Sequence, residues 1–236
     1  ALLDDIEAEL RAVDGRDAVF AAIPAARADY IAECANQEGT KQFLNALQNY
    51  PLLAGMKANL YKCFLPLAWR VTHKAGISGL LHPEGPYDDP KGQMLRKELY
   101  PRLRLHFQFV NELGLFSEVH SRATYSINLY GDVASSPRFE HIANLLLPST
   151  IDASYQHDGL GVLGGPKDDN GARNTSGHRD RIVVVDVPAL ETFAALYDAA
   201  GTPPLCARLP ALYSGGLGQA LAKLASYEPR SDEWGE

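Results

Sequence analysis

The sequence predicts an α/β fold in which helices cover a mostly parallel sheet. Three short apolar runs, ISGLLH, LHFQFV and TYSINLY, have the length and composition of strands, at residues 77–82, 105–110 and 124–130. Helical patterns precede the first run and separate it from the second. This order is typical of parallel sheets. The third run follows the second so closely that we expect an antiparallel hairpin at the sheet edge.

Two helices are expected on either side of the first strand. Residues 57–73 place apolar side chains at helical spacing, with Pro66 as an expected kink. A second helix is expected at about 90–100, with Asp88 or Asp89 as its cap. These helices supply the layer that the sheet needs to bury its face.

The first part of the chain is expected to be helical. Residues 2–13, 24–36 and 38–48 carry helical patterns, separated by turn residues. No motif with recognisable chemistry occurs among them. We therefore interpret residues 1–55 as a helical insertion or linker.

Residues 134–236 are expected to form an appended α/β segment. Their Gly-, Asp- and Asn-rich stretch at 156–180 predicts an extended loop. The apolar run RIVVVDV predicts a strand at 181–187. Two further helices are expected at 188–200 and 216–226.

Composition narrows the class of protein. The chain has 236 residues, of which 46% are hydrophobic, enough for one globular domain or slightly more. No stretch approaches the ~18–20 continuous apolar residues of a membrane span, so we expect no membrane partner. The three cysteines lack paired spacing, which is typical of buried thiols in a reducing compartment and favours a cytoplasmic location.

Charge gives a mixed indication about nucleic acid. A formal net charge of −7 argues against a protein that wraps DNA, because phosphate contacts need Lys and Arg. Residues 91–104, however, contain five basic residues and one acidic residue, Glu98, a surplus of four positive charges (5 − 1). The basic residues are Lys91, Arg96, Lys97, Arg102 and Arg104. The cluster is either a solvated helix face or a surface that contacts phosphate.

The order of short blocks between Asn59 and Gly131 carries a resemblance to a known family. The blocks are Asn-Leu-Tyr (59–61) with Phe64, His-Pro-Glu-Gly (82–85), Lys-Gly (91–92), Glu-Leu-Gly-Leu-Phe (112–116) and Tyr-Ser-Ile-Asn-Leu-Tyr-Gly (125–131). This succession resembles the second half of the catalytic domain of adenine-specific (N6) DNA methyltransferases of the type IIG restriction–modification and phage-defence group. It covers about a third of the chain.

The resemblance implies a fold and a domain organisation. Residues 56–133 would be the downstream half of the catalytic domain, a partial Rossmann-like methyltransferase sheet. Residues 134–236 would lead toward a region that determines sequence specificity. The implied cofactor is S-adenosyl-L-methionine, and the implied partner is double-stranded DNA.

The resemblance also implies roles for individual residues. Phe64 would pack on the adenine ring of the methyl donor, beside Asn59 and Tyr61, because an aromatic face stacks well on a base. Phe116 would stack on the target base after it leaves the duplex. Both phenylalanines would then face one cleft at the same rim of the sheet. Each ring would equally suit a plain core position.

Further residues are assigned to the DNA and to the base pocket. Pro83 and Glu84 end a predicted strand, where open α/β sheets place ligands, and would line the pocket of the target base. A simple turn is the alternative. The candidates for phosphate contact are Lys91, Arg96, Arg102 and Arg104.

The chain departs from the family in two respects. The glycine-rich motif that holds the methionine part of the cofactor is absent upstream, and so is the Asn-Pro-Pro-Tyr/Phe motif that orients the adenine amino group. The chain alone therefore lacks a catalytic centre. We expect the remainder of the methyltransferase to come from the same polypeptide or from another subunit.

Two other classes of function remain open. A hydrolase that uses a divalent ion would employ His82, Glu84, Asp88 and Asp89, or a second group: Asp152, His157 and Asp158. Neither set has the spacing of a known metal motif, so no metal ligand is assigned. A non-catalytic scaffold that binds DNA or a partner would also explain the missing motifs. Paired Cys/His spacing and a Gly-x-Ser-x-Gly elbow do not occur.

Overall fold

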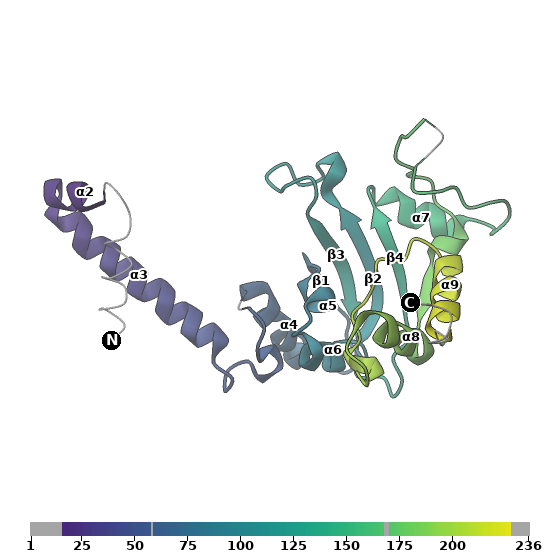
Figure 1. Ribbon diagram of the computed structural model, residues 1–236, viewed down its shortest axis with the longest axis horizontal. Coiled ribbons are helices and arrows are strands. Elements are labelled where there is room, and N and C mark those ends of the chain that lie inside the picture. Colours follow the sequence, from purple (N-terminus) through teal and green to yellow (C-terminus); the bar gives the residue numbers. More distant parts are fainter. Residues whose placement is uncertain (1–15, 58, 168–169, 228–236) are drawn as a thin grey trace, which may run out of the picture. The chain divides into compact units, whose positions relative to one another are not determined.

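The computed structural model describes residues 16–57, 59–167 and 170–227 (Figure 1). Its contacts divide the chain into two units, Ala1–Cys63 and Phe64–Glu236. The helix expected at residues 2–13 lies outside the described residues. Within those residues, no helix has the length and apolarity needed to cross a bilayer.

The first unit is helical, as expected. Before α4 (Leu60–Val71), its described residues form two helices and a short 3-10 turn: α2 (Arg16–Ala22), α3 (Pro24–Asn45) and η1 (Pro51–Leu53). The prediction of two separate helices at 24–36 and 38–48 is wrong, because α3 runs through both. Gly39 does not interrupt α3: it is exposed, nothing would crowd a side chain there, and one glycine costs only about 1 kcal/mol of helix stability.

The prediction of a helix over residues 57–73 is confirmed by α4 (Leu60–Val71). Pro66 lies inside it. Asn59 precedes it and accepts the Lys62 N–H through its carbonyl, at 3.0 Å. The Asn59 side chain accepts the N–H of Tyr61, at 3.4 Å. Asn59 therefore caps the helix, which is a common role for this residue type.

The second unit alternates strands with short helices. In chain order its elements are β1 (Ser78–Pro83), α5 (Gly85–Asp88), α6 (Gln93–Leu99), β2 (Leu103–Val110), η2 (Asn111–Leu113), β3 (Thr124–Tyr130), β4 (Phe139–Leu145), α7 (Ser149–Gln156), η3 (Arg179–Arg181), β5 (Val183–Val185), α8 (Val187–Tyr197), η4 (Pro204–Cys206) and α9 (Gly215–Ala225). The predicted α/β class is confirmed. The three strands expected first are β1, β2 and β3, within two residues at each end.

The sheet has the order β1-β3-β2-β4-β5 (Figure 1). Its direction differs from the expectation of a mostly parallel sheet, because only β2 and β4 pair in parallel. The other three pairs are antiparallel. β3 inserts between β1 and β2 and runs against both. β4 and β5 belong to the same sheet, so the boundary expected at residue 134 falls inside one folded unit.

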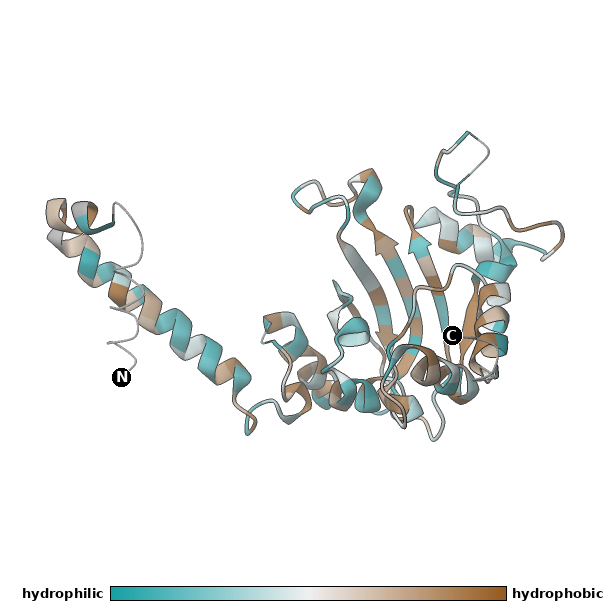
Figure 2. Cartoon of the chain, viewed as in Figure 1, coloured by the Kyte–Doolittle hydropathy of each residue, from teal (hydrophilic) through white to brown (hydrophobic). Residues whose placement is uncertain are grey.

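The two faces of the sheet differ in chemistry. Polar and apolar residues alternate along the strands (Figure 2), so the two faces differ in their balance of side chains. One face carries an apolar cluster formed by Phe107, Phe109, Tyr125, Ile142 and Leu145. Helix α7 covers part of it through Ile151 and Tyr155. The opposite face carries buried polar side chains beneath α5, α6 and the segment after η4.

Strand β4 was not predicted, and a bulge explains the weak pattern. Its register with β2 shifts between the Phe107 and Phe109 positions. Asn144 at the bulge has a left-handed backbone with φ of 57°, which few residues other than Gly adopt. The buried Arg181 donates to the carbonyl of Ala143 at 2.9 Å and to that of Asn144 at 3.3 Å, and so stabilises the irregular turn of the strand.

Helix α6 carries a buried arginine. The side chain of Arg96 is 0% exposed and donates to the backbone carbonyls of Cys206, Pro86 and Asp89. The guanidinium therefore joins α5, α6 and η4. The expectation that Arg96 contacts DNA phosphate does not fit this burial, because its donors are turned into the protein.

We expect Arg96→Met to destabilise the protein strongly. The variant leaves three buried carbonyls without their donor, at a cost of about 1–3 kcal/mol each, so the free energy of unfolding should fall by about 3 kcal/mol or more. Urea denaturation followed by circular dichroism measures it. Lys97→Met, exposed on the same helix, is the control and should change stability by about 0.5 kcal/mol or less. Equal effects of the two variants would contradict a structural role for Arg96.

Candidate functional site

A row of polar side chains lies on the covered face of the sheet. Asn128 on β3, His106 on β2 and His141 on β4 are neighbours in the strand register, and each is at most 1% exposed. Buried polar groups need hydrogen-bond partners to be stable. This row, together with the groups that satisfy it, forms what we name the polar cluster: Asn128, His106, His141, Glu84, Tyr87, Tyr130 and His82.

Glu84 orients the two neighbouring histidines. Its Oε2 lies 3.3 Å from Nε2 of His106, and Nδ1 of His106 lies 2.7 Å from Nδ1 of His141. Burial alone would raise the pKa of the Glu84 carboxyl, but His106 and Ser126 outweigh burial and hold this pKa below its ordinary value. The carboxylate is therefore ionised near neutral pH. One proton occupies the contact between the two Nδ1 atoms.

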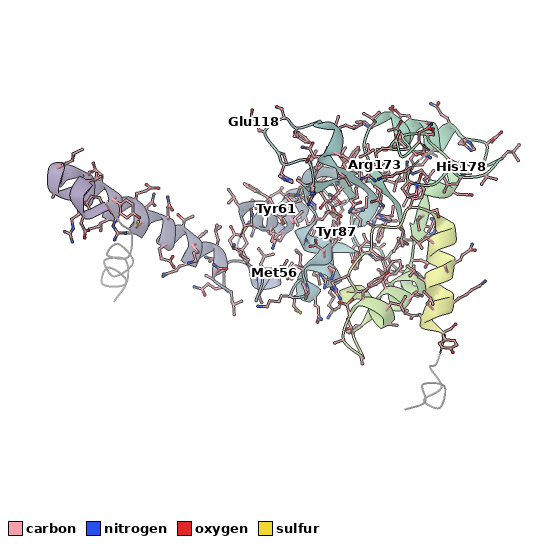
Figure 3. The ribbon with its side chains drawn as sticks, turned by 45° about the horizontal axis from the view of Figure 1, so that its top comes forward. Met56, Tyr61, Tyr87, Glu118, Arg173 and His178 are labelled. Carbon is pink, nitrogen blue, oxygen red and sulfur yellow. The ribbon has the colours of Figure 1, made fainter. Side chains whose placement is uncertain are left out.

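Two tyrosines add hydrogen bonds to the polar cluster, although Oε1 of Glu84 and Nε2 of His106 have no hydrogen-bond partner among the described residues. The Tyr87 hydroxyl donates to Oδ1 of Asn128 at 2.5 Å, and the Tyr130 hydroxyl lies 3.0 Å from Nε2 of His82. The Tyr87 ring also packs edge-on against His106, with 4.3 Å between ring centres. Figure 3 shows Tyr87 among the densely packed side chains of this unit. Burial raises the pKa of both tyrosines, which therefore stay protonated.

The polar cluster is structural in this fold. Burial lowers the pKa of His82, and it lowers the pKa of His141 still further, helped by His106. His82 and His141 are therefore neutral near pH 7. Every member of the cluster is at most 8% exposed, so a substrate has no access to these groups. Their hydrogen bonds instead fasten α5 to the sheet.

The burial of Glu84 bears on two of the expectations from sequence. Its carboxylate points to His106 rather than to a surface that a nucleobase can reach, so its expected place in a base pocket does not fit. The neighbouring Pro83 is exposed, and its expected contact stays a prediction. Among the described residues, no group of three or more His, Cys, Asp or Glu side chains is arranged to hold a metal ion.

Phe116 lies in the loop between β2 and β3. Its side chain is 41% exposed, and its ring packs edge-on against Tyr125, with 5.0 Å between centres. The fully buried Asn111 fixes the loop: its side-chain oxygen accepts the Phe116 N–H, and its amide nitrogen donates to the carbonyls of Phe116 and Val119. The loop therefore presents one ring face from a defined backbone. Asn111 was not identified from the sequence.

Phe64 lies on α4, and its side chain is 51% exposed. The ring is therefore available to a partner, as its expected role requires. Helix α4 meets the sheet through Trp69, whose ring lies 5.6 Å from that of Tyr130. Tyr130 ends β3, whereas Phe116 lies near its beginning, at Tyr125. The structure thus connects the two phenylalanines to opposite ends of one strand, and their shared cleft stays a prediction.

The other predicted phosphate contacts are more accessible than Arg96. Lys91 is exposed. Arg102 forms an ion pair with Glu98 at 2.8 Å, and its guanidinium lies 5.2 Å over the Trp69 ring. Arg104 donates to the carbonyls of Pro101, Leu103 and Asp132. Arg102 and Arg104 therefore place fixed positive charge at the end of the sheet where β2 begins and β3 finishes.

The apolar face of the sheet becomes progressively more exposed toward β1. One row of paired residues crosses four strands in the order Ile142, Phe107, Ile127 and Leu81. Ile142 is 0% exposed, Phe107 is 8% and Leu81 is 54% exposed, with Ile127 partly buried. β1 is also the last strand, and no described strand pairs with its outer edge. We name this region, the outer edge of β1 with Leu81 and Ile127, the open edge.

Comparisons with known proteins give a structural similarity but no family or sequence match. No protein-family model matches the chain, and no curated protein matches it. Among solved structures, the crystal structure of the type IIG restriction endonuclease BpuSI is similar over 42% of this chain and 12% of that enzyme, with 16% sequence identity and a TM-score of 0.31. The similar part is thus a small fraction of the enzyme.

The buried histidines predict how stability depends on pH. Their pKa values lie below the ordinary 6.5 in the folded state, so below about pH 6.5 the unfolded chain binds protons that the folded chain does not. Stability should therefore be fully present above pH 6.5 and fall on acidification, by about 1.4 kcal/mol per pH unit for each such proton. Chemical denaturation at pH 7.5, 6.5 and 5.5 measures this slope.

The variant His141→Gln tests the assignment. It should lower the pH dependence of the unfolding free energy by the contribution of about one proton. His120→Gln, at an exposed histidine, is the matched control. A slope unchanged by His141→Gln would contradict the neutral, buried state of His141.

Proposed function

We propose that this chain is part of an S-adenosylmethionine-dependent methyltransferase that acts on adenine N6 in DNA, in restriction–modification or phage defence. It would supply the downstream half of the catalytic domain. The open edge is the single observation that carries the proposal. A sheet with an unpaired last strand and an exposed apolar face beside it is what half of a larger sheet presents.

The physical cost of the open edge supports this proposal. An unpaired strand presents a row of N–H and C=O groups that readily pair with another strand. Leu81 adds an apolar side chain to the exposed face, where burial by a covering element would stabilise the protein by about 1.5–3 kcal/mol. A further strand along β1 would pair with its free N–H and C=O groups. A helix over Leu81 and Ile127 would bury the exposed apolar side chains. That segment would carry the two motifs that the present sequence lacks.

The exposed aromatic rings fit the roles that the resemblance implies. In the assembled enzyme, Phe64 would form one wall of the cofactor site, and Phe116 would stack on the extruded adenine. Extrusion of a base costs a few kcal/mol, part of which an aromatic partner recovers. S-adenosylmethionine would supply the methyl group. The residues present fit only one wall of its site, since the polar groups that hold its methionine part must come from the missing segment.

A scaffold without catalytic activity is the second candidate. The absence of the Asn-Pro-Pro motif from this sequence favours it. A scaffold would bind its partner through the open edge and through the end of the sheet where Arg102 and Arg104 place positive charge. It would not require an exposed aromatic ring at Phe64 or Phe116. Methyl transfer by the native assembly distinguishes the two candidates.

We expect the native assembly, purified through a tag on this chain, to transfer radiolabelled methyl groups to duplex DNA. Phe116→Ala should lower kcat/KM by at least about 10-fold, because the extruded base loses its stacking partner. For a duplex with a mismatched target adenine, the loss of kcat/KM caused by Phe116→Ala should be smaller, because that base is already partly unstacked. Leu113→Ala, exposed in the same loop, is the control. Absence of any transfer would favour the scaffold.

Hydrogen exchange tests the open edge directly. In the native protein we expect the β1 amides that point away from β3 to be protected as strongly as those that bond to β3, because a further strand covers them. Amide exchange resolved by residue and read by mass spectrometry or NMR measures this. Rapid exchange of the outward amides alone would show that no strand pairs there, and the half-domain proposal would fail.

A further inference from the structure

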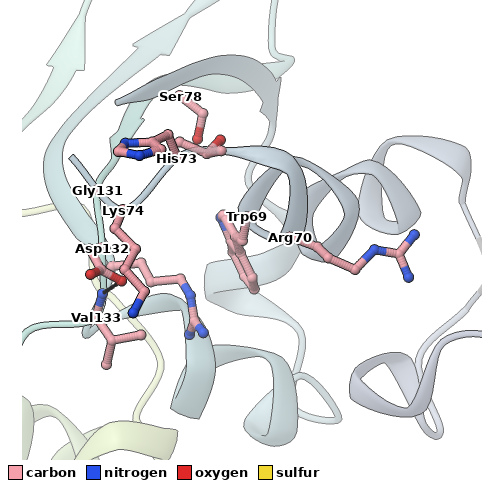
Figure 4. Close-up of a pocket in the computed structure, with 10 residues that line it drawn as sticks. Trp69, Arg70, His73, Lys74, Ser78, Gly131, Asp132 and Val133 are labelled. Atoms are coloured by element: carbon pink, nitrogen blue, oxygen red, sulfur yellow. Dashed lines mark hydrogen bonds between the residues drawn. The ribbon is translucent and has the colours of Figure 1, made fainter. Parts of the chain in front are cut away.

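A small cavity lies where β3 ends and β1 begins. Its walls come from the end of α4, the turn that follows it, the start of β1 and the residues after β3. Its volume is about 230 Å³. Figure 4 shows Trp69, Lys74 and Ser78 around it, with Asp132 beside Lys74. The volume is below the roughly 300–1,000 Å³ of sites for small-molecule ligands and cofactors, so the cavity suits a single chemical group.

Two hydrogen-bond donors at the cavity lack an acceptor among the described residues. These are Nε1 of Trp69 and Oγ of Ser78, both shielded from solvent at the atom itself. An indole N–H can only donate, and a buried donor without an acceptor costs about 1–3 kcal/mol. The Trp69 ring is held in place between Tyr130 and the guanidinium of Arg102. The donor is therefore fixed before any ligand arrives.

Positive charge surrounds these donors. Lys74 and Arg102 line the cavity, and Arg104 lies directly behind Gly131, where an added Cβ would come within 3.2 Å of its guanidinium. Asp132 is the acid among the lining residues, which leaves a surplus of two (3 − 1) for these four groups. Lys74 has no ion-pair partner among the described residues, whereas Arg102 shares its charge with Glu98. Arg104 is anchored on carbonyls, so its charge is fixed in place.

We propose that this cavity binds one phosphate group of a nucleic-acid backbone. Trp69 and Ser78 would donate neutral hydrogen bonds to its oxygens, and Lys74 and Arg102 would donate charged ones. A tetrahedral phosphodiester can accept donors that approach from several sides, as these do from α4, the turn after it, the start of β1 and the residue before β2. The assignment of the phosphate to DNA rests on the proposed function; the binding of a phosphate group does not.

The site differs from the basic surface that sequence indicated. That cluster was defined by charge along residues 91–104, and two of its five members, Arg102 and Arg104, contribute here. Trp69, Lys74 and Ser78 all lie 24 or more positions before Arg102 (102 − 78 = 24 for Ser78), outside any recognisable motif. Only the folding of α4 against Tyr130 brings them together with Arg102.

The test measures binding of a labelled 20-base-pair duplex to the native assembly by fluorescence anisotropy at several salt concentrations. Trp69→Phe removes the indole N–H while keeping an aromatic ring at this position, so Kd should rise about 3- to 10-fold for duplexes of any sequence. Lys74→Gln should weaken binding and lower the slope of log K against log salt by about 0.9. Lys223→Gln, an exposed lysine on α9 with the same loss of charge, is the matched control.

The outcomes separate this inference from the proposed function. Weakened DNA binding by Trp69→Phe and Lys74→Gln supports the phosphate site even where the assembly transfers no methyl groups. Binding by both variants equal to that of the wild type overturns the site, even where methyl transfer is present. A change of Trp69 fluorescence with inorganic phosphate that duplex DNA does not compete away would assign the cavity to a free phosphate and overturn the backbone assignment.

Discussion

The contact between Glu84 and His106 is the constraint on which the second unit depends. It places an ionised carboxylate and two stacked imidazoles under the sheet, where every polar atom needs a partner. Tyr87 lies three residues beyond Glu84 and donates a hydrogen bond to Asn128 in the same row, so hydrogen bonds act together with apolar contacts in fixing the cover of the sheet. Removal of one member leaves its neighbours buried and unsatisfied, which is why such networks usually act as a unit.

In this sheet the face with the polar cluster is the better covered one, whereas sheets usually bury their apolar face. The face under α5 and α6 is closed although it is polar, and the apolar face is closed only where α7 lies over Phe107. The side chains that are accessible for binding therefore lie at the ends and the edge of the sheet: in the Phe116 loop, at the positively charged end near Arg102 and along the open edge. Folds commonly carry binding residues on loops and ends of a rigid framework, and here the closed polar cluster supplies the rigidity.

The sequence predicted local structure better than it predicted the relations between distant segments. Strand β3 was located at its observed ends because its alternation is regular, whereas β4 was missed because Asn144 interrupts its pattern. Strand direction was wrong since it depends on where β3 inserts, which no local pattern encodes. The burial of Arg96 and Glu84 was not predicted for the same reason. Their charged groups contact partners from distant parts of the chain, whereas a charged residue taken by itself is expected to be exposed. Asn111 carried no distinguishing signal.

The open edge also affects how the isolated chain would behave. A strand with free hydrogen-bonding groups accepts any extended segment of suitable length, including the same strand of a second copy, so β1 is a template for self-association while its outer edge is uncovered. Two residues limit this tendency: Gly79 weakens the strand interior, and Pro83 offers no N–H at its end. Self-association through β1 would therefore compete with folding wherever this edge stays uncovered.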